Sequence, residues 1–159
     1  MKSTFKNLFL ATIGSLVFAC GGEKESQSSQ GGVQTQQAAK AAVDPYENWK
    51  DYQGVGPVKE FTLPNEIDET LATTGQTIFE SKCTACHKTD KKFIGPSPKD
   101  ILNRRNPAWI MNMILVPDKM VVEDPIAKKL IMDFNGSPMA NQSLTEDEAR
   151  AVLEYFRTL

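Results

Sequence analysis

One short run of residues in this sequence has the composition and spacing of a reactive site. Cys83 and Cys86 are separated by two residues, and His87, the single histidine of the chain, follows directly. The pattern C-x-x-C-H is the attachment motif for a c-type haem. Two thiols at this spacing can reach the two vinyl groups on one edge of a porphyrin, and the adjacent imidazole can then bind the iron. The motif therefore predicts one covalently bound haem c, with His87 as an axial ligand.

Two other interpretations of this motif stay open from the residues alone. A C-x-x-C pair also occurs in redox-active dithiols, which favour a βαβ setting, whereas the surrounding sequence has a helical pattern. Two cysteines also form half of many zinc sites, but only Asp or Glu could complete four ligands, because the domain offers no further Cys or His. Export of the chain favours the haem, since haem c is attached outside the cytoplasm.

The second axial position of the iron needs another residue type, because the chain has one histidine, and methionine is the leading candidate. Among the five methionines after residue 100, three lie in helical patterns, where methionine is more often a core residue. Met139 instead lies in the irregular segment 135–142, between two expected helices, where the backbone can bring a thioether to the face opposite His87. Met120 follows Pro117 in an expected loop and is the alternative ligand.

The first twenty residues have the features of an export signal. Lys2 and Lys6 supply positive charge, and the apolar stretch 8–18 is too short to cross a bilayer, which needs about 20 residues. The segment ends in Val17-Phe18-Ala19-Cys20, which resembles the lipobox of bacterial lipoproteins. This resemblance implies cleavage before Cys20 and attachment of lipid to its sulfur. We therefore expect an exported, membrane-anchored lipoprotein that faces the periplasm, with the lipid membrane as one partner.

Composition divides the 159 residues into four parts, a length that favours a single domain. Residues 1–19 form the expected signal peptide, and residues 20–43, rich in Gly, Gln and Ser, form an expected disordered tether. Residues 44–64 combine aromatic residues with prolines and predict an extended arm packed on the domain, with a short strand at 58–63. Residues 65–159 remain for the folded domain.

Hydrophobic periodicity and helix-end signals predict that this domain is all-α. Asn65, Asn106 and Thr145 are expected N-caps, and Thr145 forms a capping box with Glu148. Pro117 is expected to end one helix, and Gly136 another. The expected helices cover 65–82, a short stretch near 97, 107–116, 125–134 and a segment from about 144 toward the C-terminus.

Residues 68–159 resemble a class I cytochrome c. Gly75 and Phe79 match the glycine and aromatic positions of the family's first helix, and the haem motif follows directly. Gly95-Pro96 matches the segment that comes after the motif, and Met139 precedes a terminal helix with the aromatic pair 155–156. The resemblance implies a small helical domain around a covalently bound haem.

Three contacts follow from this resemblance. The first and last helices would cross at Gly75, where the missing side chain allows close approach. Phe79 would then pack against Leu153 or Phe156. The Pro96 carbonyl would accept a hydrogen bond from the His87 imidazole, which orients the ring and raises its basicity.

The resemblance also implies a one-electron carrier and not an enzyme. An iron held by His87 and Met139 has no open position, so no small-molecule substrate is expected, and a thioether ligand favours Fe(II). The alternative is a five-coordinate haem sensor or a peroxidase-like protein, which requires an open or labile sixth position.

Charge indicates what kind of partner this carrier has. The net charge of −2 argues against nucleic-acid binding. Residues 80–105 carry seven basic and three acidic residues, and this segment could steer docking to an acidic redox protein at the membrane, although a solvated face is an equal alternative. Arg105 and Trp109 are candidates to contact a haem propionate. The stretch 104–111 resembles single-haem cytochromes that accompany periplasmic respiratory reductases, including nitrous oxide reductase.

Overall fold

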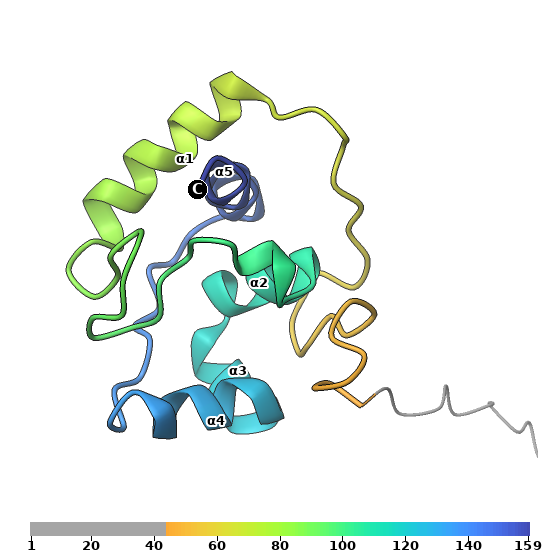
Figure 1. Ribbon diagram of the computed structural model, residues 1–159, viewed down its shortest axis with the longest axis vertical. Helices are drawn as coiled ribbons and strands as arrows, with labels where there is room; N and C mark the ends of the chain where they lie inside the picture. The colour runs from red at the N-terminus through yellow and green to blue at the C-terminus, as the bar shows by residue number, and fades with distance from the viewer. Residues whose placement is uncertain (1–43) are drawn as a thin grey trace, which may run out of the picture. The chain divides into compact units, whose positions relative to one another are not determined.

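The computed structural model describes residues 44–159, and this part of the chain is helical and contains no β-strand (Figure 1). The all-α fold class is therefore confirmed. None of the helices between residues 44 and 159 has the length and apolar character needed to cross a membrane. The elements are α1 (Glu69–Lys82), the 3₁₀ turn η1 (Ile101–Asn103), α2 (Pro107–Leu115), α3 (Pro117–Glu123), α4 (Pro125–Asp133) and α5 (Glu146–Phe156).

Side chains at the helix ends account for most of these bounds. The Asn106 side chain accepts the Ala108 N–H at 2.8 Å at the start of α2, and Thr145 and Glu148 form the capping box of α5, so these two predicted caps are confirmed. The cap predicted at Asn65 is wrong. Helix α1 begins later than expected, at Glu69 and not near residue 65. The Asp68 carboxylate accepts the Leu71 N–H at 2.9 Å and is the N-cap, which leaves residues 65–67 outside the helix.

Two expectations between the haem motif and α4 were wrong. Pro117 ends α2 as predicted, but it also begins α3, so the loop expected after it is a helix. Proline is well suited to the first position of a helix, because its missing N–H has no helical partner there and its φ is already helical. The short helix expected near residue 97 is a single 3₁₀ turn at 101–103.

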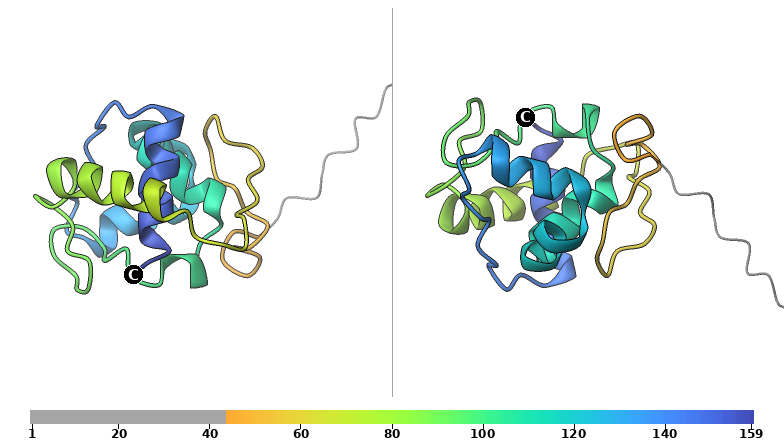
Figure 2. Two further views of the ribbon diagram at one scale, coloured as in Figure 1. Left: turned by 90° about the horizontal axis from the view of Figure 1, so that it is seen from above. Right: turned by 90° about the horizontal axis from the view of Figure 1, so that it is seen from below.

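Helices α1 and α5 cross at a steep angle with their backbones in direct contact (Figure 2). A Cβ built on Gly75 would lie 1.9 Å from the Ala151 carbonyl oxygen, so any side chain at this position would push the two helices apart. The Phe79 ring meets the Phe156 ring edge-on, with centroids 5.7 Å apart. The predicted crossing at Gly75 and the packing of Phe79 on Phe156 are both present, and this pair of helices holds the haem motif at the end of α1.

The arm, residues 44–64, is joined to the helices through buried polar side chains. The Val58 N–H donates to Asn112 Oδ1 at 2.9 Å, and Asn112 Nδ2 donates back to the Val58 carbonyl at 2.8 Å. The strand expected at 58–63 is absent, because a side chain on α2 takes the hydrogen bonds that a neighbouring strand would otherwise make. Nearer the start of the arm, the Tyr52 hydroxyl donates to Asp124 at 2.8 Å, at the N-terminus of α4.

Candidate functional site

The end of α1 places the C-x-x-C-H motif. Cys83 is the C-cap of α1, and its N–H donates to the Phe79 carbonyl at 2.8 Å. The His87 N–H in turn donates to the Cys83 carbonyl at 2.9 Å, so the motif forms one further turn at the helix end. Cys83 is half-buried, Cys86 is exposed, and both thiols are free. Burial raises the pKa of the Cys83 thiol.

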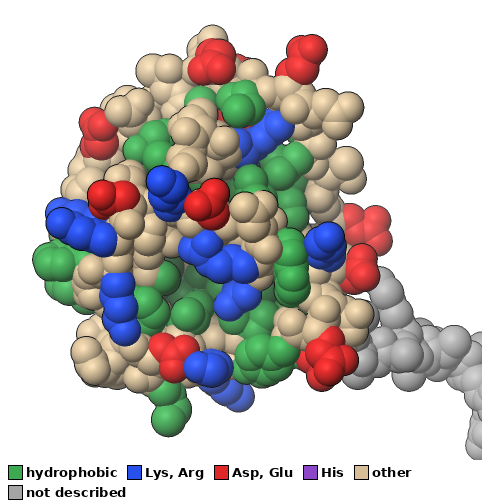
Figure 3. Space-filling model, in the orientation of Figure 1, with side chains coloured by type: hydrophobic (Ala, Val, Ile, Leu, Met, Phe, Trp, Pro, Cys, Tyr) green, Lys and Arg blue, Asp and Glu red, His purple; other side chains and the backbone are tan. Residues whose placement is uncertain are grey.

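This turn opens on a cavity lined mainly by apolar side chains from α2, α4, α5 and the loops on either side. Figure 3 shows a hollow on this face, with hydrophobic side chains inside it and Lys and Arg side chains around it. Cys83, Cys86 and His87 all line the cavity. Its other walls include Ile94, Ile101, Trp109, Ile110, Ile114, Leu130, Phe134, Leu144, Val152 and Phe156. A large flat apolar group attached to the two thiols would lie among these side chains.

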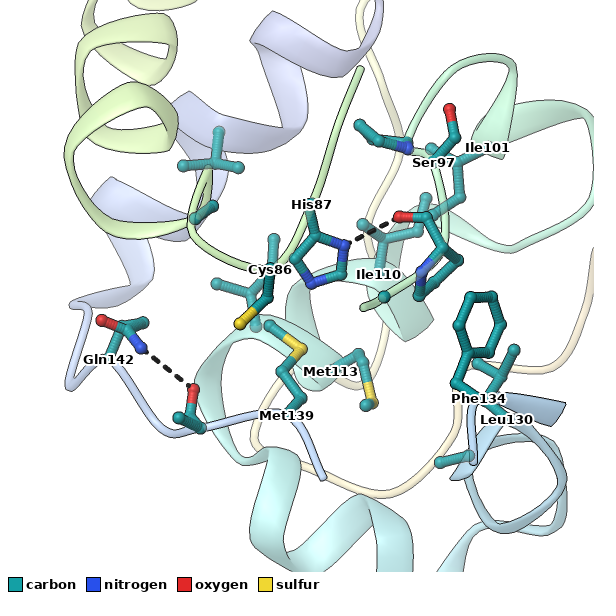
Figure 4. Close-up of a pocket in the computed structure, with 18 of the residues that line it drawn as sticks. Cys86, His87, Ser97, Ile101, Ile110, Met113, Leu130, Phe134, Met139 and Gln142 are labelled. Carbon is teal, nitrogen blue, oxygen red and sulfur yellow. Dashed lines mark hydrogen bonds between the residues drawn. The ribbon is translucent and has the colours of Figure 1, made fainter. Parts of the chain in front are cut away.

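The His87 ring is held in one orientation by the next loop. Its Nδ1 lies 2.7 Å from the Pro96 carbonyl oxygen, which can only accept, so the proton is on Nδ1 and Nε2 is free. Figure 4 shows the second ring nitrogen directed toward the side of the cavity where Cys86 and Met139 lie. A Cβ on Gly95 would lie 2.5 Å from His87 Cε1, so the ring occupies the space of a side chain that glycine lacks.

Two of the methionines, Met139 and Met113, line the cavity. Met139 comes from the loop between α4 and α5, and Figure 4 shows its side chain among the residues that line the cavity with Cys86 and His87. The alternative ligand, Met120, is fully buried elsewhere, where its sulfur accepts the Val55 N–H of the arm at 3.3 Å. The sequence does not indicate that Met113 lines the cavity, because a methionine within a helical pattern is usually a core residue.

Arg104, Arg105 and Trp109 also line the cavity. Burial lowers the pKa of both guanidinium groups, and neither forms an ion pair with a carboxylate among residues 44–159. Arg104 donates to two backbone carbonyls, those of Ser97 and Lys99. Arg105 lies over the Trp109 ring, 5.3 Å from its centroid, and the Trp109 indole N–H donates to Asp124 at 3.2 Å. The sequence suggests that Trp109 contacts a haem propionate, but its indole N–H already donates to Asp124.

The surroundings of the motif bear on the two competing interpretations. A redox dithiol favours a βαβ setting, and residues 44–159 contain no strand. A zinc site needs further ligands close to the cysteines, and the described part of the chain holds no group of three or more His, Cys, Asp or Glu that could bind a metal ion. The geometry at Cys83 and Cys86 therefore supports the haem.

Residues 72–159 match the profile of the cytochrome c family, which is more than half of the chain. The chain belongs to the cytochrome c family. It is similar in structure to cytochrome c from Rhodothermus marinus, with 44% sequence identity and a TM-score of 0.62 over 65% of this chain and 88% of that one. An engineered form of the R. marinus cytochrome c aligns at 43% identity and a TM-score of 0.62, over 65% of this chain and 89% of that chain. A comparison with curated proteins gave no match.

As a member of this family, this cytochrome c carries one covalently attached haem c and transfers electrons through it. The residues of the cavity fit that group. The two thiols have the spacing that attachment needs, the walls are apolar, and Gly95 leaves room for the imidazole beside them. The haem itself supplies the reversible one-electron change between Fe(II) and Fe(III).

Proposed function

We propose that this cytochrome c is an electron carrier, not an enzyme, with Cys83 and Cys86 as the attachment points of its haem and with His87 and Met139 as the two axial ligands. One observation carries the proposal: the free Nε2 of His87 and the Met139 thioether line the same apolar cavity from two different segments of the chain. A pair of protein ligands leaves no open position for a substrate. A thioether in one of those positions also favours the reduced state.

The chain's own residues prepare this site in three ways. The Pro96 carbonyl keeps the proton of His87 on Nδ1, so that Nε2 remains a donor to the metal. The mainly apolar walls give a flat apolar group a surface to pack against. Arg104 and Arg105 place two partly buried positive charges at the cavity wall, where they would pair with the two propionates of a haem.

The optical spectrum of the haem-loaded protein tests this proposal. We expect a six-coordinate, low-spin haem with a thioether-to-iron absorption band in the oxidised state. A high-spin, five-coordinate ferric spectrum would instead favour the sensor or peroxidase-like alternative. A preparation that stays colourless after expression with haem-attachment machinery would contradict both.

We also propose that an acidic redox protein docks at the rim of the cavity beside the motif. Phe93 and Ile94 are 49% and 45% exposed, and Lys88 lies 5.1 Å from the centre of the Phe93 ring. Lys92 lies 4.3 Å from the centre of the Phe134 ring, and Phe134 lines the cavity. Apolar contacts edged by positive charge suit brief docking to a negatively charged surface. Periplasmic respiratory reductases, nitrous oxide reductase among them, are the partners to test first, by electron-transfer kinetics at several ionic strengths.

Residues 1–43, which carry the predicted signal peptide, Cys20 and the tether, lie outside the described residues. From the lipobox pattern at 17–20 we propose that lipid on Cys20 anchors the carrier to a bacterial membrane on the periplasmic side. Cells grown with a labelled fatty acid should label the wild-type protein, and Cys20→Ser should lose the label and leave the membrane fraction. Label retained in Cys20→Ser would reject the anchor.

A further inference from the structure

The aspartate that begins α4 is a fully buried carboxylate. Asp124 has 0% of its surface exposed. Its Oδ1 accepts the Ala127 N–H at 2.8 Å, and its Oδ2 accepts the Tyr52 hydroxyl at 2.8 Å and the Trp109 indole N–H at 3.2 Å. Each of these three groups donates, and an indole or amide N–H can only donate, so the arrangement suits the ionised form of the side chain.

The carboxylate of Asp124 lies directly behind the wall of the haem cavity. Two of its three donors, Trp109 and Ala127, are themselves cavity-lining residues. Trp109 comes from α2 and Ala127 from α4, so the carboxylate joins the two helices from the side away from the cavity. One residue therefore separates this negative charge from the space that the haem occupies.

The charge of this carboxylate is not paired directly with a cation. Asp124 forms no ion pair within residues 44–159. One cation still interacts with it through space. The Arg105 guanidinium lies over the Trp109 ring, and burial lowers the pKa of Arg105 while the charge of Asp124 opposes that shift. Two tyrosines of the arm are the other titratable groups near Asp124. Tyr52 donates to its carboxylate, and the Tyr46 hydroxyl donates at 3.0 Å to the carbonyl of Pro125, the next residue along the chain. Burial and the contact with Asp124 raise the pKa of Tyr52, so this phenol stays neutral.

We propose that Asp124 is a fixed negative charge that favours the oxidised haem and so lowers the reduction potential of this carrier. The inference rests on the proposed function, since it needs the haem to change its charge within that cavity. Oxidation adds one positive charge to the iron and porphyrin. In a poorly solvated interior, an anion close behind the cavity wall stabilises that added charge far more than an exposed anion would.

The test is the midpoint potential of haem-loaded Asp124→Asn. Asparagine keeps the size of the side chain and can still cap α4, but it carries no charge. We expect the equilibrium to shift toward Fe(II) by about tenfold, which is a rise of 59 mV for a one-electron couple. Asp124→Ser is a second neutral variant with a capping hydroxyl, in case the asparagine amide opposes the Trp109 N–H. Glu123→Gln, which removes an exposed carboxylate at the end of α3, should leave the potential unchanged.

Tyr52→Phe distinguishes the effect of the Asp124 charge from the effect of detaching the arm. It removes one hydrogen bond to Asp124 and one attachment of the arm, but it keeps the negative charge, so the potential should not rise. An equal rise in Tyr52→Phe and Asp124→Asn would show that the arm is responsible and would overturn the proposal. An unchanged potential in Asp124→Asn, with the wild-type spectrum retained, would also overturn it. If the wild-type protein itself has no low-spin spectrum, that result would instead count against the proposed axial ligands.

The wild-type protein provides a reading that needs no variant. In a reduced-minus-oxidised infrared difference spectrum, protein labelled with ¹³C-carboxyl aspartate should show a shifted carboxylate band, because the field at Asp124 changes with the charge of the haem. A difference spectrum without any aspartate signal would contradict the proposal even if neither neutral variant folds.

Discussion

Met139→Ala should remove the thioether-to-iron absorption band of the haem-loaded protein and lower its midpoint potential by on the order of 100 mV. The reason is the loss of the soft sulfur ligand that favours Fe(II). The structure places the Met139 side chain on a loop whose residues 138–144 donate no N–H to a backbone carbonyl. If Met139 is the ligand we propose, its bond to the iron would help to hold this loop over the cavity, and the variant should also show a more labile sixth position. Optical and redox titrations of the same preparation measure both effects.

Three other methionines serve as matched controls for this variant. Met113→Leu tests the second thioether in the cavity, Met120→Leu tests the methionine bound to the arm, and Met132→Leu tests one that is 80% exposed. Each should keep the absorption band. Persistence of the band in Met139→Ala and its loss only when Met113 is also replaced would assign the ligand to Met113 and contradict our choice.

Glu154→Gln should destabilise the folded domain by about 3–5 kcal/mol without changing the visible spectrum of the haem. Glu154 is fully buried on α5, and it forms ion pairs with Arg150 and with Arg157, the latter at 2.6 Å. Its carboxylate also accepts the Asp68 N–H at 2.8 Å at the start of α1. Glutamine retains the shape and this last bond but leaves two largely buried arginines without their anion.

The effect should extend beyond α5, because the two arginines connect it to other segments. Arg157 donates to the carbonyls of residues 64, 65 and 66, between the arm and α1. Arg150 lies 5.2 Å from the centre of the Phe61 ring in the arm. Thermal unfolding followed by circular dichroism should show a midpoint lower by more than about 10 °C, since each kcal/mol corresponds to several degrees for a domain of this size.

Glu146→Gln provides the control for the loss of one carboxylate from the same helix. Glu146 is exposed in the first turn of α5, so its replacement should cost less than about 1 kcal/mol. If Glu154→Gln unfolds within 1 kcal/mol of Glu146→Gln, the buried ion pairs do not contribute to stability in the way we infer.

Several features of this protein follow from residues that are neighbours along the chain. The spacing of Cys83, Cys86 and His87 predicts the haem because attachment and ligation need only one turn of backbone. The caps at Asn106 and Thr145 are predictable for the same reason, since each bond spans two or three residues. Gly75 is also predictable from the family pattern. The physical reason appears only in the structure, where a Cβ at this position would lie 1.9 Å from the Ala151 carbonyl oxygen.

Other features were decided only by contacts between distant segments. Whether Met113 or Met120 reaches the cavity depends on how α2 and α3 pack, and a helical pattern with methionine in it fits either outcome. The helix after Pro117 was missed because proline marks a boundary and does not say on which side the helix lies. The arm forms no strand because Asn112, 54 residues after Val58, takes its hydrogen bonds.

Residues close together along the chain are enough to predict the chemistry of attachment, the helical class and the local ends of most helices. The tertiary structure alone decided which methionines face the haem cavity and that Asp124 collects donors from residues 52, 109 and 127 behind its wall. The physical reason is the range of the interactions. Motif spacing and capping act within one or two turns, whereas burial of a charge or a thioether depends on which remote segments meet around it.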